Sequence, residues 1–122
     1  YQELFNSLAA ASGTNSVAMP FEVFAAGFMQ DAPEAAQRAV HQLLVPQPMQ
    51  YFTAPVAPLD ATRLGVPASY LLSTEDIALP PGEFAWAPRF PQRLGVKAAE
   101  TPGSHEALFT TPETLATAIA KL

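Results

Sequence analysis

Two apolar runs that each end at one titratable side chain constrain the fold of this sequence more than any other feature. The first, residues 70–80, leads through Tyr-Leu-Leu-Ser to Asp76, and the second, residues 96–105, ends at His105. A rigid sheet can aim functional side chains from the loops at its strand ends. An acid after one strand and a histidine after the next are two of the three members of a nucleophile–histidine–acid triad. We therefore predict that Asp76 and His105 are catalytic residues, with Asp76 orienting the imidazole.

The third member of such a triad is missing from the sequence. No nucleophile elbow of the form Gly-x-Ser-x-Gly occurs in the 122 residues. We reject Ser16, Ser73 and Ser104 as nucleophiles because none lies on a glycine-flanked turn from a strand to a helix. The sequence therefore resembles the back half of an enzyme whose nucleophile lies elsewhere.

Composition excludes several classes of function. Eleven acidic residues oppose six scattered basic ones, for a net charge of −5, which argues against a nucleic-acid partner. There is no cysteine, and the two histidines have no carboxylate cluster near them, so we predict neither a metal site nor a cofactor. No apolar stretch approaches the ~20 residues that a membrane helix requires. The first residues lack the basic region of a signal peptide, and we predict a cytoplasmic protein without a membrane partner.

The first part of the sequence, residues 1–50, is predicted to be helical. Apolar periodicity and helix-breaking residues delimit three helices, over residues 1–11, 20–30 and 31–44. Asp31 is the candidate N-cap of the third. Residues 51–67 carry several of the thirteen prolines and little periodicity, so we predict an extended connector.

The remaining part, residues 68–122, has the pattern β-α-β-α, which implies parallel strands joined by a right-handed crossover. The predicted strands are residues 69–73 and 96–100, and the predicted helices are residues 82–93 and 113–122. Two strands cannot make a stable sheet with helices on both faces, so further strands must come from elsewhere. The apolar fraction of 49%, against only 14% charged residues, agrees with a surface buried against a missing partner.

Three motifs in residues 68–122 resemble the C-terminal end of an α/β-hydrolase. Asp76-x-x-x-Pro80 resembles the acid loop after the penultimate strand, and Gly103-Ser104-His105 resembles the histidine loop after the last strand. Thr111-Pro112-Glu113-x-Leu115-Ala116 resembles the start of the closing helix. The greatest similarity is to the plant methylesterase and hydroxynitrile-lyase branch and its bacterial relatives.

The resemblance implies a fold and a division of the chain. The fold is α/β, the C-terminal portion of an α/β-hydrolase in which helices flank a parallel sheet, and it is incomplete as an independent fold. Residues 1–50 take the position of the helical cap over the active site, residues 51–67 the connector, and residues 68–122 the hydrolase core. The first strands, the oxyanion-hole loop and the nucleophile elbow would be supplied by an N-terminal portion, a partner that is either a separate chain or missing residues.

The sequence contains one competing acidic residue, Glu75, and one other histidine, His41. Asp76 has the family's offset to Pro80, so we prefer it to Glu75, which we expect to be a solvated neighbour. His41 is expected at the surface or at the cap interface.

Aromatic residues allow two interpretations. Phe24 and Phe28 are candidate substrate-binding residues under the cap, although an apolar helix face is core more often than pocket. Trp86, with Phe84 and Phe90, is expected to pack on the inner face of the crossover helix.

The function implied is hydrolysis of an ester or related acyl compound through an acyl-serine intermediate. Few charges and an apolar cap indicate a small, apolar, ester-type substrate. One alternative is hydroxynitrile-lyase-like C–C cleavage on the same fold. Another is a non-catalytic interaction module that retains hydrolase motifs.

Overall fold

Two parallel strands, β3 (Tyr70–Ser73) and β4 (Ala98–Thr101), form the sheet in the C-terminal half of the chain. The structure is a computed structural model that describes residues 1–57, 60, 63 and 65–122. The register pairs the first residues of the two strands with each other and the last residues, Ser73 and Thr101, with each other. Parallel pairing agrees with the β-α-β interpretation, although β4 begins two residues later than predicted.

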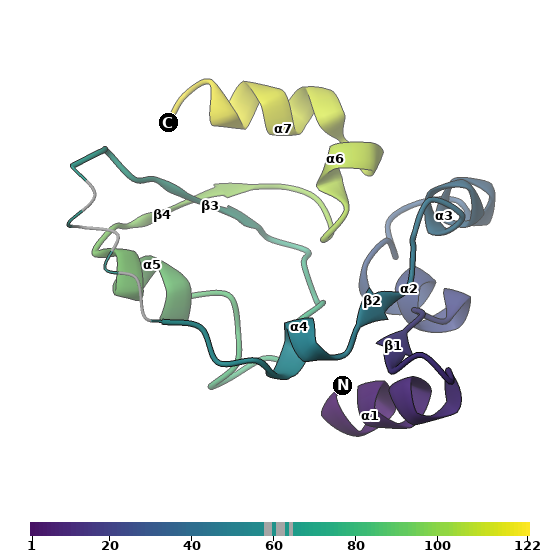
Figure 1. Ribbon diagram of the computed structural model, residues 1–122. Helices are drawn as coiled ribbons and strands as arrows, with labels where there is room; N and C mark the ends of the chain where they lie inside the picture. Colours follow the sequence, from purple (N-terminus) through teal and green to yellow (C-terminus); the bar gives the residue numbers. More distant parts are fainter. Residues whose placement is uncertain (58–59, 61–62, 64) are drawn as a thin grey trace.

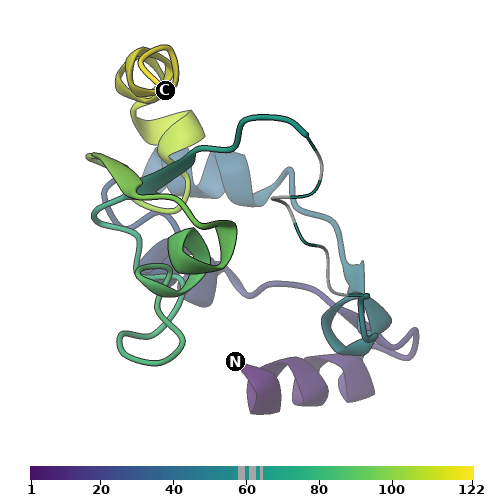
Figure 2. The same cartoon turned by 90° about the vertical axis from the view of Figure 1, so that its left-hand side faces the viewer.

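Helices lie on both faces of this sheet. α7 (Pro112–Ile119) lies over one face and α5 (Arg89–Leu94) lies on the other (Figures 1 and 2). The carboxyl ends of both strands point toward the N-terminal helices, α1 (Gln2–Ala11), α2 (Phe21–Gly27) and α3 (Glu34–His41) (Figure 1). The loops after β3 and β4 therefore meet the N-terminal half of the chain.

The N-terminal half contains a strand pair that periodicity does not predict. β1 (Ser16–Val17) pairs antiparallel with β2 (Gln47–Pro48). Val17 is buried with Ala9 of α1 and Met49, and these three form a small core. A two-residue strand is too short to produce an alternating pattern, so burial of Val17 and Met49 in tertiary contacts decides this pairing.

All of the predicted helices are shorter than expected, the three in the middle of the chain most of all. α2 ends at Gly27, and α3 begins at Glu34 with Pro33, not Asp31, as its N-cap. α5 begins only at Arg89, because the prolines before it lack an N–H group and disfavour helix in the residue that precedes each.

The connector predicted over residues 51–67 is extended only in part. The short helix α4 (Gln50–Thr53) occupies its beginning, which corrects the prediction for these residues. Residues 58, 59, 61, 62 and 64 of the predicted connector lie outside the described residues.

Little of the apolar content is buried. Among the described residues, seven apolar side chains are buried: Ala9, Val17, Phe24, Met29, Met49, Ala78 and Ala107. Large apolar side chains are exposed across the surface, including Leu43, Val45, Tyr51, Val56 and Leu108. In the part of the chain that the structure describes, no helix is long and apolar enough to cross a membrane.

The small core and the two-stranded sheet lead to a prediction about stability. We expect residues 1–122, expressed alone, to be aggregated or molten, because unpaired strand edges and exposed apolar side chains favour association. Binding of a hydrophobic dye and the absence of a cooperative thermal transition would be measured. A monomer with dispersed amide resonances and a sharp transition would contradict this expectation.

Candidate active site

The Asp76 carboxylate is held in one orientation by its own loop. Its backbone N–H donates to the Ser73 carbonyl at 3.2 Å, and its Oδ1 accepts a hydrogen bond from the Ala78 amide at 2.9 Å. The side chain is only 11% exposed. Burial raises the pKa of nearby Tyr70, and the negative charge of Asp76 raises it further by a smaller amount. Tyr70 therefore stays a neutral phenol beside the site. Oδ2 is left to face the neighbouring loop.

His105 meets that free carboxylate oxygen. Its Nδ1 lies 2.9 Å from Oδ2 of Asp76, and its side chain is 32% exposed. Because a carboxylate accepts hydrogen bonds and does not donate them, Nδ1 carries the proton. A neutral imidazole then presents the lone pair of Nε2, which has no hydrogen-bond partner among the described residues. The structure thus brings the two predicted residues together, while their catalytic roles stay predictions.

The backbones of the two loops remain paired beyond the ends of the strands. The Thr74 amide donates to the Thr101 carbonyl at 2.9 Å, and the Glu75 amide donates to the Gly103 carbonyl at 3.1 Å. Gly103 has φ of +126°, and a Cβ built there would lie 2.9 Å from Cβ of Ala107. Only glycine fits this turn without strain, and the turn aims His105 at Asp76.

Two aromatic rings flank the imidazole. The Trp86 ring stacks on it with centroids 5.6 Å apart, and the Phe28 ring meets it edge-on at 5.1 Å. This corrects the prediction that Trp86 packs on the inner face of a crossover helix, since Trp86 precedes α5 and contacts the site. No local pattern reveals the stack, because the two residues are distant in sequence.

A cavity of about 320 Å³ opens beside His105. Phe24, which is 2% exposed, and Phe28, which is half-buried, both line it, as does Glu106. The rest of its lining comes from Val17, Met19, Leu43, Leu44, Val45, Gln47, Phe52 and His105. Phe24 and Phe28 therefore lie where the sequence predicts a substrate pocket, although nothing yet tests whether they bind substrate.

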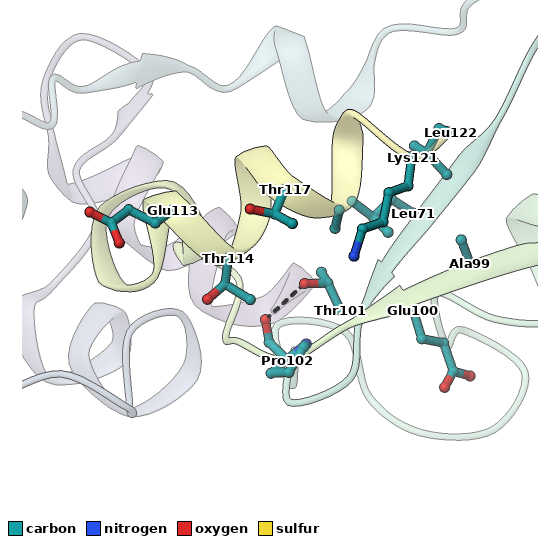
Figure 3. Close-up of a pocket in the computed structure, with 11 residues that line it drawn as sticks. Leu71, Ala99, Glu100, Thr101, Pro102, Glu113, Thr114, Thr117, Lys121 and Leu122 are labelled. Carbon is teal, nitrogen blue, oxygen red and sulfur yellow. Dashed lines mark hydrogen bonds between the residues drawn. The ribbon is translucent and has the colours of Figure 1, made fainter.

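A larger hollow, of about 550 Å³, lies between β4 and α7 (Figure 3). Thr114 and Thr117 of α7, and Lys121 just after it, face Thr101 and Pro102 across the hollow. Neither Asp76 nor His105 lines this hollow, so its size does not make it the candidate site.

The other residues considered in the sequence do not hydrogen-bond to the side chains of Asp76 or His105 among the described residues. Ser104 is completely buried, and Glu75 is exposed to solvent. His41 donates from Nε2 to the Met19 carbonyl at 2.7 Å and packs against Phe21. Over the described ranges, no group of three histidine or acidic side chains could hold a metal ion.

Asp31 contacts the histidine loop, which sequence patterns do not predict. Its Oδ2 accepts from the Ser104 amide at 3.3 Å and from the Thr110 hydroxyl at 3.0 Å. Partial burial by itself would raise the pKa of Asp31, but hydrogen bonding from Ser104 and Thr110 outweighs burial and holds this pKa below its ordinary value. The carboxylate is therefore ionised at neutral pH.

Comparison with known proteins identifies the class of fold. No family model matches the chain. No curated protein matches it either. A solved structure matches 98% of the chain with a TM-score of 0.81 and 31% sequence identity: an extracellular α/β-hydrolase from a Paenibacillus species, described as sharing structural and functional homology with tobacco salicylic acid binding protein 2.

This match supports the α/β-hydrolase family for the chain. The chain spans half the length of that structure. The matching protein is extracellular, so the cytoplasmic location expected from the sequence stays a prediction.

Gly103 provides a test of how the histidine loop is held. We expect Gly103→Ala to lower the free energy of unfolding by about 1–3 kcal/mol, because the new Cβ would meet Ala107 and Thr111 at a φ that side chains rarely adopt. Gly82→Ala is the matched control, since Gly82 has φ of +91° but no atom within 4 Å of an added Cβ. Denaturant unfolding of each variant, together with the N-terminal portion that we expect from the sequence, measures both losses; equal losses would show that crowding at Gly103 is unimportant.

Proposed function

We propose that this chain supplies the acid and the histidine of a serine-type α/β-hydrolase that cleaves small, uncharged esters. The observation that carries the proposal is the 2.9 Å contact from Nδ1 of His105 to Oδ2 of Asp76, which leaves Nε2 available. The nucleophilic serine would lie on an N-terminal portion, since the chain has no nucleophile elbow and spans half of the matching hydrolase.

In this proposal Nε2 of His105 is the general base. It takes the proton from the serine hydroxyl as the serine oxygen attacks the ester carbonyl carbon, and the C–O bond to the alcohol then breaks. The imidazolium returns that proton to the departing alkoxide, which leaves an acyl-serine. A water molecule, deprotonated by the same Nε2, releases the acid and restores the serine. Asp76 keeps the proton on Nδ1 and stabilises the imidazolium.

The cavity beside His105 supports an apolar, uncharged substrate. Aromatic and aliphatic side chains form most of its lining, and apolar groups are stabilised by leaving water for such a cavity. Glu106 also lines it, and its negative charge would repel a substrate carboxylate. Residues 1–50 would serve as the cap in this arrangement, because α2 and the segment that follows it contribute Phe24 and Phe28 to the wall.

The catalytic assignment is tested by substitution in the complete assembly. We expect His105→Ala to lower kcat for p-nitrophenyl butyrate by about three orders of magnitude or more, because the serine loses its base. Asp76→Asn should lower kcat by a comparable amount, since an amide can donate to Nδ1 and so favour the wrong tautomer.

Glu75→Gln is the matched control for Asp76→Asn. Glu75 is adjacent in sequence and exposed, and its substitution should change kcat less than about tenfold. If His105→Ala retained wild-type turnover, the chain would be better explained as a non-catalytic module. Turnover of cyanohydrins in place of esters would favour the lyase alternative.

The cavity is tested by changing its wall. We expect Phe28→Ala to lower the ratio of kcat/KM for the butyrate ester to that for the acetate ester by about tenfold, because the longer acyl chain loses its apolar contact. Comparing two esters on one variant cancels any effect on the imidazole that Phe28 also contacts. Val56→Ala, at a side chain that is 88% exposed, should leave the ratio unchanged. An unaltered ratio in Phe28→Ala would exclude this cavity as the acyl site.

A further inference from the structure

One short segment of the N-terminal half contacts both loops of the candidate site. We call this segment, residues 28–31, the clasp. The Phe28 carbonyl accepts from the Glu106 amide at 3.1 Å, and Nε2 of Gln30 donates to the Glu75 carbonyl at 2.6 Å. Met29, between them, is only 1% exposed. The clasp therefore hydrogen-bonds to Glu106, directly after His105, and to Glu75, directly before Asp76.

Asp31 supplies the third attachment, and it reaches both sides of His105. One oxygen, Oδ2, accepts from the Ser104 amide, directly before the histidine, and from the Thr110 hydroxyl, at the end of α6 (Ala107–Thr110). A single acceptor thus ties together two points of the chain that are six residues apart. Hydrogen bonds to an ionised carboxylate are stronger than those between neutral groups.

Capping of the nearby helix α3 does not explain these contacts of Asp31. Pro33 is the N-cap of α3, and no side chain caps that helix. Asp31 instead bonds residues 73 and 79 positions away in the sequence. Its partners belong to the loop that carries the base.

We propose that Asp31 is a positioning residue, which anchors the Ser104 amide before His105 and the Thr110 side chain after it so that the imidazole stays in reach of Asp76. This inference rests on the proposed function. His105 is one-third exposed and depends on its loop for its position, and a displacement of about 1 Å from productive geometry can lower a rate about a hundredfold. The clasp also joins the cap segment to the loops, so that cap and base are held as one unit.

The test uses the complete assembly and three variants. Asp31→Ala removes the acceptor, Asp31→Asn keeps a side-chain oxygen but not the charge, and Glu34→Gln removes a nearby carboxylate whose ion pair with Arg38 lies within α3. Hydrogen exchange of the Ser104 amide and steady-state hydrolysis of p-nitrophenyl butyrate are both measured.

We expect Asp31→Ala to speed exchange at Ser104 and to lower kcat, each about tenfold, with KM changed less than about twofold. Asp31→Asn should recover much of both losses, and Glu34→Gln should match the wild type. Unchanged exchange and kcat in Asp31→Ala would overturn the proposal. Equal acceleration throughout α1 and β1 would also overturn it, because the effect would then be general destabilisation.

The two measurements separate this inference from the proposed function. A wild-type assembly without activity on esters would remove the proposed function. Exchange at Ser104 would still decide whether Asp31 anchors the loop.

Discussion

The parallel pairing of β3 with β4 sets the separation of the two loops that carry Asp76 and His105. Ser73 and Thr101 are paired at the ends of the strands, and backbone hydrogen bonds continue past them to Glu75 and Gly103. Parallel strands end at the same edge of a sheet, so side chains that follow them meet there. The carboxylate and the imidazole reach each other because this ladder brings their loops together.

The surroundings of the imidazole come from three separate parts of the chain. Trp86 stacks on one side, Phe28 meets the ring edge-on, and Asp31 holds the backbone next to it. The ring is thus restrained by packing as well as by its bond to Asp76. The general base that we propose for His105 would need such restraint, because proton transfer depends on a short, aligned contact. The apolar cavity begins at this restrained ring, which would bring a bound ester within its reach.

Packing and sheet size are both consistent with our proposal that an N-terminal portion completes this chain. The sheet around β3 and β4 has two strands in the described part of the chain, and many large apolar side chains remain exposed. A parallel sheet is ordinarily buried on both faces. The match to half of a longer hydrolase agrees with this view. The N-terminal portion would then complete both the core and the chemistry.

The sequence by itself determined the two parallel strands, the positions of Asp76 and His105 after them, and the helices at both ends of the chain. These features depend on local patterns: apolar runs, proline and glycine positions, and the residues that follow a strand. The tertiary structure decided the rest. The sequence pattern predicts Asp31 as a helix cap, but its side chain bonds Ser104 and Thr110. The pattern predicts that Trp86 packs on a helix face, but its ring stacks on the imidazole of His105. Such contacts join residues that are distant in sequence. Local sequence patterns therefore cannot predict them, and only the folded chain brings the residues together.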